Sequence, residues 1–356
     1  DGVKFGVFGL ATPETAVKAS PKNTEGLEFQ EPVEVAKKEV AALQEEGADV
    51  IILLAHLGLD EETKEAWRSD AIAKEVEGID LIIDGHSHTT LEEGLKVGNS
   101  MIVSTGSHFE NVGLVKLSLA EDGTKTIEAS LLPFVEMVQY EKDPEIEDYI
   151  AAIEEENKRY TDVKVAELSA TLEGEREDVR TGETNLADLI ADAMLWATDA
   201  DVVITNGGGI RASIEAGTVT MGDLLTVLPF GNQVTVIKVT GQDIIDALNY
   251  GTDAYPETAG KFSQVAGMSY KLVEGSDGFS VEDVKMGDQA VDPEAEYLLA
   301  TNDFMAIGGD GYTMFEGKEQ VLLQGLMVDI VRDYIENELV KDGSFSYEMD
   351  GRITIE

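Results

Sequence analysis

Three of the four histidines in this 356-residue chain follow runs that are typical of buried strands. His56 comes directly after the apolar run Val50–Ala55, while His86 and His88 follow the run Ile79–Ile83. In open α/β sheets, ligands bind beyond the carboxyl ends of the strands. Imidazole suits zinc, manganese or cobalt. We therefore interpret these three histidines as candidate metal ligands.

The loop Asp84–His88 decides how two of these side chains are aimed. Gly85 allows the backbone to turn sharply beside a metal. If the loop is extended, its alternate residues aim His86 and His88 at the same place. A lone histidine is more often structural than a ligand, and His108, near a predicted turn, is interpreted in that way. Three histidines at the ends of neighbouring strands favour a metal site.

A glycine-rich segment and two aromatic residues indicate a second site. Thr205–Arg211, with the sequence TNGGGIR, follows an apolar strand, and its three glycines permit close backbone approach to a ligand. Phe230 and Phe304 could clamp a planar base between their rings, a contact worth about 1–3 kcal/mol per base. Asn232 offers a donor and an acceptor to a base edge. The structural alternative for the two rings is core packing.

Charged residues near these motifs suit phosphate and ribose. Arg176, Arg180 and Arg211 have forked donors that can hold phosphate. Asp310, placed between glycines, could accept hydrogen bonds from ribose hydroxyls. The alternative for the arginines is surface ion pairing, because the chain has 71 acidic against 26 basic residues.

Alternating strands and helices must position the histidines over the first 115 or so residues. Pro32 suits the first turn of a helix and Gly47 lies just past its end. The pattern predicts a layered α/β arrangement. Strands are expected at Lys4–Leu10, Asp49–Ala55, Ile79–Ile83, Ser100–Ser104 and Val112–Leu119, all in one sheet, with helices at Pro32–Glu46 and Thr63–Val76.

After a charged connecting helix, strands and helices alternate again in the second half of the chain. We expect domains at residues 1–140 and 161–356, joined by the helix 141–160. Thr184 or Asn185 should cap the first helix of the second domain. Strands are expected at Asp201–Thr205, Gln233–Val239, Gly267–Leu272 and Tyr297–Asn302, with helices at Asn185–Thr198, Gln242–Tyr250 and Leu326–Val340.

Composition excludes several classes of function. A formal net charge of −45 repels nucleic acid polymers and anionic membranes. This charge indicates either simply a well-solvated surface or, more specifically, an adaptation to high salt. No apolar run approaches the ~20 residues needed to span a bilayer. The absence of cysteine excludes disulfides, thiolate chemistry and cysteine-based zinc sites.

The motifs together resemble a known family. Leu54–Gly58 and Gly85–His88 resemble the last metal-ligand motifs of dinuclear metallophosphatases. The match is to 5'-nucleotidases and UDP-sugar hydrolases, and it covers essentially the whole chain. The resemblance implies a partial four-layer metallophosphatase-type α/β domain joined by a helix to an α/β 5'-nucleotidase C-terminal domain. The motifs that resemble this C-terminal domain are Glu173–Arg180, Thr205–Arg211, Leu228–Asn232 and Asn302–Tyr312.

The resemblance also implies residue roles. His56 and His86 would bind one divalent metal and His88 a second, with zinc, manganese or cobalt expected. In the nucleotide pocket, Phe230 and Phe304 would stack the base, Asn232 would contact it, Gly260 would line the pocket, Asp310 would bind ribose, and Arg176, Arg180 and Arg211 would bind phosphate or ribose.

One departure from the family concerns the catalytic residues. The family's earlier motifs supply an Asp-x-His pair, a bridging aspartate and an Asn-His segment with the catalytic histidine, and nothing after Asp1 matches them. We therefore assign no catalytic residue. We expect this chain alone to bind metal weakly or not at all and to hydrolyse little, either as a fragment or until a missing N-terminal segment completes the site.

The implied activity is hydrolysis of 5'-nucleotides to nucleoside and phosphate, with the second domain carrying the substrate to the metals by rotation. Family habit points to a periplasmic, cell-wall or extracellular location. Two alternatives remain open. One is a non-catalytic module that binds nucleosides or nucleotides. The other is a relative that acts on UDP-sugars or 2',3'-cyclic nucleotides.

Overall fold

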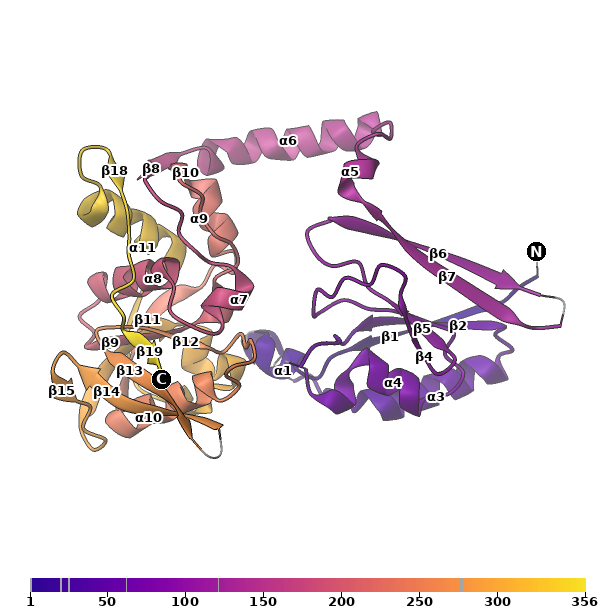
Figure 1. Cartoon of the computed structure of the whole chain (residues 1–356), viewed down its shortest axis with the longest axis horizontal. Coiled ribbons are helices and arrows are strands. Elements are labelled where there is room, and N and C mark those ends of the chain that lie inside the picture. The colour runs from indigo at the N-terminus through magenta and orange to yellow at the C-terminus, as the bar shows by residue number, and fades with distance from the viewer. Residues whose placement is uncertain (1, 20, 25, 62, 121, 276–277) are drawn as a thin grey trace. The chain divides into compact units, whose positions relative to one another are not determined.

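The chain divides into two compact units, each with its own core. The structure is a computed structural model that describes residues 2–19, 21–24, 26–61, 63–120, 122–275 and 278–356 (Figure 1). The first unit comprises Asp1–Ala16 and Thr24–Ile146, and the second comprises Val17–Asn23 and Glu147–Glu356. The mixed α/β class expected from the sequence is confirmed.

The first unit is built on a five-stranded sheet. Its strands β1, β2, β3 and β5 are parallel, and β4 pairs with β5 in the antiparallel sense. Helices α3 (Pro32–Glu45) and α4 (Ser69–Glu75) lie along one face (Figure 1), since parallel neighbours need crossover connections. The strands, in sheet order, are β1 (Phe5–Ala11), β2 (Val50–His56), β3 (Leu81–Ile83), β5 (Ser100–Val103) and β4 (Leu95–Val97).

Two expectations for this unit are wrong. The strand expected at Val112–Leu119 does not continue the sheet, because β6 (Asn111–Leu119) pairs with β7 (Lys125–Pro133) in a separate two-stranded antiparallel sheet. The helix expected at Thr63–Val76 is divided into a 3₁₀ turn, η1 (Glu65–Trp67), and α4. Arg68 between them is extended, with φ −70° and ψ 151°, because the backbone N–H of Ser69 donates to Gly58 instead of continuing the helix.

The short helices of this part of the chain are α1 (Thr15–Lys18), α2 (Pro21–Thr24) and α5 (Phe134–Met137). The expected charged helix is present as α6 (Pro144–Thr161). Asp143 precedes it and accepts from the backbone N–H of Glu145 at 2.9 Å. Its apolar stripe, which includes Ile146 and Tyr149, is exposed to solvent.

The second unit is built on a central sheet with a core on each face. In this sheet β9 and β16 are parallel neighbours, and the other pairs are antiparallel. Along β9 the side chains alternate, so that Val202 and Ile204 enter one core and Val203 the other. The strands, in sheet order, are β12 (Ser263–Ala266), β9 (Val202–Asn206), β16 (Glu296–Asn302), β11 (Gln233–Thr240) and β17 (Gln320–Leu326).

Helices cover both faces of this sheet. The core on one face includes residues of α8 (Asn185–Trp196), α9 (Met221–Val227) and α11 (Met327–Tyr334), and α10 (Gly241–Thr252) contributes to the other. The π-helix η6 (Ile335–Leu339) continues α11. Thr184 caps α8 as expected, because its hydroxyl accepts from the backbone N–H of Ala187 at 3.2 Å.

Smaller elements complete this unit. One further sheet contains β10 (Gly217–Thr220), β8 (Lys164–Leu168) and β18 (Ser344–Phe345), and another contains β15 (Gln289–Ala290), β14 (Gly278–Met286), β13 (Ser269–Gly275) and β19 (Ile353–Ile355). The one-turn helices are α7 (Arg176–Val179), η2 (Gly207–Gly209), η3 (Met305–Ile307), η4 (Gly309–Gly311) and η5 (Thr313–Phe315). Among the described residues, no helix combines the length and apolarity needed to cross a bilayer.

Candidate functional site

Two buried asparagines end the parallel strands β9 and β16 of the second unit. Because these strands are neighbours, the segments 207–211 and 303–312 leave the sheet at the same edge. The side-chain amide of Asn206 donates to Asp310 Oδ2 at 2.7 Å. Asn302 in turn donates to Asn206 Oδ1 at 3.0 Å. These hydrogen bonds fix the Asp310 carboxylate beside the glycine-rich turn.

The backbone at Asp310 is held in an uncommon conformation. Its φ is 54°, in the left-handed region, and the nearby glycines Gly308 and Gly311 have φ of 91° and 84°. The hydroxyl of Tyr250 donates to the carbonyl oxygen of Asp310 at 2.8 Å. Such conformations cluster at ligand sites, where the surrounding structure holds them. The loop therefore presents Asp310 in one orientation.

The glycine-rich turn packs closely against two other segments. The N–H of Gly208 donates to the carbonyl of Gly260 at 2.7 Å, and a Cβ on Gly208 would lie 2.8 Å from that oxygen. A Cβ on Gly207 would lie 2.2 Å from the carbonyl oxygen of Val179 in α7. A Cβ on Gly260 would lie 3.9 Å from Arg180 Nη1. The structure thus brings Gly260 and Arg180 to this turn, and Arg180 is a buried residue.

The other two predicted arginines lie on adjoining segments. The guanidinium carbon of Arg211 lies 5.8 Å from the centroid of the Phe230 ring, within the range of a cation–π contact. The hydroxyl of Ser213 donates to Glu175 at 2.9 Å, which joins the segment after Arg211 to the residue before Arg176. Both arginine-bearing segments therefore border the turn.

A pocket adjoins this arrangement. Phe230 lines it and is 62% exposed, so its ring is available to a ligand. Asn232 also lines it, although its amide already donates to Asp303 at 3.0 Å. Phe304 is half-buried and packs against the core to which α10 contributes. That the two rings face one another stays a prediction. The lining residues are Gly209, Leu228, Phe230, Gly231, Asn232, Asn302, Met327 and Val328.

In the first unit, two of the predicted metal ligands meet at the strand ends. His86 Nδ1 lies 3.3 Å from His56 Nε2. His86 Nε2 lies 2.8 Å from an oxygen of Glu14, a buried residue that follows β1. His56 is the last residue of β2, whereas the sequence predicted that it would directly follow the strand. Three neighbouring segments thus converge on His86.

Asp84 holds the loops that carry these two histidines. Its carboxylate accepts from the backbone N–H groups of Leu57 at 2.9 Å, Gly58 at 3.0 Å and Gly85 at 2.8 Å. The hydroxyl of Ser69 donates to it at 2.6 Å. This network joins the end of β2 to the end of β3, and it therefore sets the distance between the two imidazoles.

The His56–His86 pair fits a divalent metal. Two imidazole nitrogens on one tetrahedral zinc, each at ~2.0–2.1 Å, would lie about 3.3–3.4 Å apart, which matches the observed separation. A carboxylate on the outer nitrogen, here Glu14, is the usual partner of a metal-bound histidine. Desolvation, followed by repulsion from His86, lowers the pKa of His56 against the attraction of Asp84. The neutral form that results is the form that binds metals.

His88 is placed differently from the expectation of an extended loop. His86 and His88 have φ of 64° and 57°, and His88 is exposed. In the described part of the chain, the three histidines do not form a group whose ligand atoms all lie within 4.8 Å of one another. The role of His88 as a ligand therefore stays a prediction.

Sequence reasoning missed several polar residues at these sites. Asn206 and Asn302 each end a buried strand, and a polar side chain at that position is itself a signal. Glu14 lies three residues beyond β1, at the same sheet edge as the histidines. Its acidic side chain, next to a predicted imidazole cluster, would have been found by extending the strand-end argument to the first strand.

Known proteins resemble this chain in sequence and in structure. The family model described as "5'-nucleotidase, C-terminal domain" matches residues 163–317. The "Trifunctional nucleotide phosphoesterase protein YfkN" of Bacillus subtilis is 37% identical over 330 residues, which are 88% of this chain and 22% of that protein. The 5'-nucleotidase of Vibrio cholerae is 28% identical over 94% of this chain and 67% of its own length.

A solved structure has a similar fold. The 5'-nucleotidase precursor of Thermus thermophilus superposes with a TM-score of 0.83 at 29% identity, over 99% of this chain and 73% of that one. The chain thus spans about a fifth of the first of these relatives and two thirds to three quarters of the other two.

The fold is that of a two-unit α/β protein of the metallophosphatase class, and its second unit contains a pocket. Residues 163–317 belong to the 5'-nucleotidase C-terminal domain family, and the likeness to 5'-nucleotidases extends over almost all of the chain. The family resemblance stated from the sequence is confirmed.

Proposed function

We propose that this protein hydrolyses the phosphate ester of 5'-nucleotides and that its second unit binds the nucleotide. The observation that carries the proposal is the fixed Asp310 carboxylate beside the Gly207–Gly209 turn, with Arg180 and Arg211 on segments that border the same turn. Carboxylate, glycine backbone and guanidinium groups together suit ribose and phosphate. The relatives are named as a 5'-nucleotidase and a trifunctional nucleotide phosphoesterase.

Each pocket residue has a proposed task. Asp310 accepts hydrogen bonds from ribose hydroxyls, and the amide of Asn206 keeps its carboxylate in place. Phe230 stacks on the base from its exposed position, with Phe304 on the other side. The arginines Arg176, Arg180 and Arg211 bind phosphate or ribose, Asn232 contacts the base, and Gly260 lines the pocket.

In the first unit we propose a divalent metal held by His56 and His86, with His88 as the ligand of a second metal. Such metals, when bound, lower the pKa of a water and stabilise charge on a phosphoryl group. In this proposal His86 Nε2–H donates a hydrogen bond to Glu14, which leaves the lone pair of Nδ1 directed toward His56. Asp84 keeps the two loops at the required distance.

The proposal includes a further segment of the whole protein. Phe5, Val7, Leu54 and Ile83 form an exposed apolar face of the first sheet, and the relatives are longer than this chain. Apolar faces of parallel sheets are normally covered. We propose that a further segment packs there and supplies the remaining metal ligands. By family likeness we also propose a periplasmic, cell-wall or extracellular location.

Calorimetric titration with adenosine and AMP, in EDTA, tests the binding role without the metals. Both should bind, and Asp310→Ala should weaken both, while Asp246→Ala on the exposed surface of α10 should not. Phosphate release from AMP by the full-length protein with Mn²⁺ or Zn²⁺ tests hydrolysis. If adenosine and AMP both fail to bind, the proposed pocket is contradicted. If they bind but no phosphate is released, a non-catalytic binding module is favoured.

A further inference from the structure

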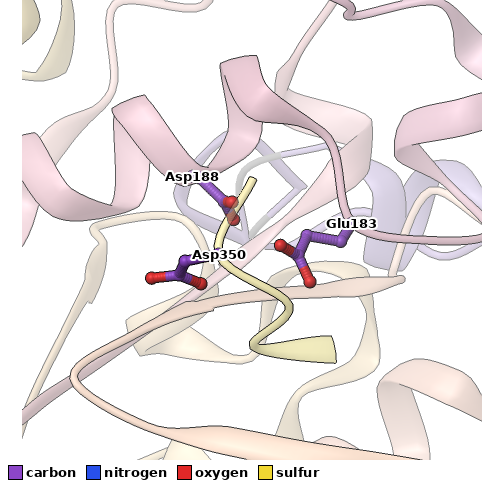
Figure 2. A group of neighbouring side chains, drawn as sticks. All are labelled: Glu183, Asp188 and Asp350. Atoms are coloured by element: carbon purple, nitrogen blue, oxygen red, sulfur yellow. The ribbon is translucent and has the colours of Figure 1, made fainter. Parts of the chain in front are cut away.

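A separate group of carboxylates lies in the second unit. One ligand oxygen from each of Glu183, Asp188 and Asp350 lies within 4.8 Å of the others (Figure 2). Glu183 is in the segment between α7 and α8, Asp188 is in the first turn of α8, and Asp350 precedes β19. We call these three residues the carboxylate cluster. None of them belongs to the pocket or to the histidine pair.

Asp188 is the unusual member of the cluster. Its exposed fraction is 0%, and among the described residues neither of its oxygens has a hydrogen-bond partner. Arg352 Nε is 3.4 Å from Asp188 Oδ1, an ion-pair contact without hydrogen-bond geometry. Figure 2 shows the Asp188 carboxylate directed from α8 into the space between Glu183 and Asp350. A buried carboxylate without donors is strongly disfavoured in its charged form.

Arg352 cannot supply the missing donor, because its five N–H groups are already used. Nε and Nη2 donate to the two oxygens of Asp350, each at 2.9 Å. Nη1 and Nη2 donate to the two oxygens of Asp192, also at 2.9 Å, and Nη1 donates to the carbonyl of Val265 at 3.0 Å. A guanidinium has five N–H donors. Asp188 receives none of them.

Glu183 is fixed as an acceptor on the other side of Asp188. The backbone N–H groups of Gly351 and Ile353 each donate to it at 2.8 Å, one to each oxygen. The four carboxylates of Glu183, Asp188, Asp192 and Asp350 against the single guanidinium of Arg352 give a formal charge of −3 at this place. The cluster therefore lacks positive charge at the point where Asp188, Glu183 and Asp350 meet.

We propose that the carboxylate cluster is a binding site for a hard divalent cation of the Ca²⁺ class. Ca²⁺ takes only oxygen ligands, at ~2.3–2.6 Å, and oxygens within 4.8 Å of one another are close enough for one ion to contact all three. Asp350 is exposed, so water can complete the coordination and the ion can enter from that side.

The bound cation would connect two distant parts of the chain. Asp188 belongs to α8, which packs in the core of the second unit, while Asp350 lies just before β19, the strand that pairs in parallel with β13. The ion would thus attach the C-terminal segment to α8. Its expected effect is on the stability of the second unit and not on the chemistry of the pocket.

Thermal unfolding of the EDTA-treated protein tests this site. Added CaCl₂, compared with NaCl at equal ionic strength, should raise the Tm at pH 8.5 by at least about 4 °C. The rise should be smaller at pH 6, because a proton competes for Asp188. Asp188→Asn should abolish the shift, and Asp246→Asn, at an exposed position, should retain it. A His86→Ala variant should also retain it, which separates this site from the histidine pair.

Calorimetric titration of Ca²⁺ gives a second measurement that does not depend on unfolding. One site should appear in the wild-type protein and in Asp246→Asn, and it should be absent from folded Asp188→Asn. The proposal is overturned if neither Ca²⁺ nor Mg²⁺ changes the Tm at either pH, or if Asp188→Asn shifts as much as the wild type. If no cation changes the Tm, protonation of Asp188 is what keeps this buried carboxyl group neutral.

Discussion

The side-chain amide of Asn206 donates a 2.7 Å hydrogen bond to the carboxylate of Asp310, although the two residues are 104 positions apart. The contact joins the end of β9 to the loop after β16. Asp310 is the proposed partner of ribose hydroxyls, so the orientation of its carboxylate depends on this asparagine.

We predict that Asn206→Ala weakens adenosine binding about 10- to 100-fold, because a hydrogen bond to a charged group is worth ~1.5–3 kcal/mol. Calorimetric titration measures the affinity, and circular dichroism checks that the variant is folded. Asn337→Ala is the matched control, since Asn337 is exposed and far along the chain in η6. A folded Asn206→Ala protein with wild-type affinity would show that Asp310 does not need this contact.

Phe230→Ala is predicted to lower the affinity for adenosine and AMP by about 10- to 100-fold, since stacking on an aromatic ring is worth ~1–3 kcal/mol per base. Its Tm should stay close to that of the wild type because the ring is largely exposed. The control is Phe109→Ala, an exposed phenylalanine of the first unit. Unchanged affinity would remove Phe230 from the pocket, and a large fall in Tm would assign it a packing role.

Glu14→Gln is predicted to weaken Zn²⁺ binding about 10- to 100-fold, because the carboxylate behind a metal-bound histidine sets its tautomer and basicity. Titration of the full-length protein with Zn²⁺ measures this effect. Glu34→Gln, on the exposed surface of α3, should bind as the wild type does. Equal Zn²⁺ affinity of the Glu14→Gln and wild-type proteins would argue that the 2.8 Å contact with His86 is only structural.

The stability of the metal-free protein should depend on Asp188 in a defined pH window. Burial raises the pKa of Asp188 from 3.8 to about 8, with Arg352 acting in the opposite direction and Glu183 and Asp350 raising it further. Between these two values the folded chain holds a proton that the unfolded chain releases. The stability of the wild type therefore falls as the pH rises from about 4 to about 8.

Asp188→Asn removes this titration because it replaces the buried carboxyl group by a neutral amide of similar size. In EDTA, the free energy of unfolding of the variant minus that of the wild type should increase from pH 4 to pH 8 and then become constant. Urea unfolding at several pH values measures the difference. A difference that is independent of pH would contradict a protonated Asp188 in the metal-free fold.

Salt is predicted to stabilise the protein. At a formal net charge of −45, the folded chain repels itself, and salt screens that repulsion. The Tm in molar KCl should exceed the Tm at low salt by several degrees. Because sulfate-like salts also strengthen hydrophobic burial, KCl is the salt of choice. Stability that does not change from low to molar KCl would reject adaptation to high salt.

The sequence by itself determined the order of most elements and the location of the strand-end sites. Continuous apolar runs such as residues 50–55 predicted buried parallel strands, and the residues that directly follow such strands must lie at one sheet edge. For this reason His56 and His86 could be placed together before their contact was observed. The family motifs likewise brought Arg180, Gly260 and Asp310 to one region.

Other features depended on contacts between distant segments. The alternating pattern of β6 suits a strand in any antiparallel partnership, so it could not show that β7 is its partner in a separate sheet. Asn206 bonds to Asp310, Asp84 bonds to Ser69 and Leu57, and Asp188 lies beside Arg352, so each contact joins segments that are distant in sequence. Local patterns record burial and backbone preference, whereas the pairing of polar groups is decided when tertiary packing excludes water and each donor must find an acceptor.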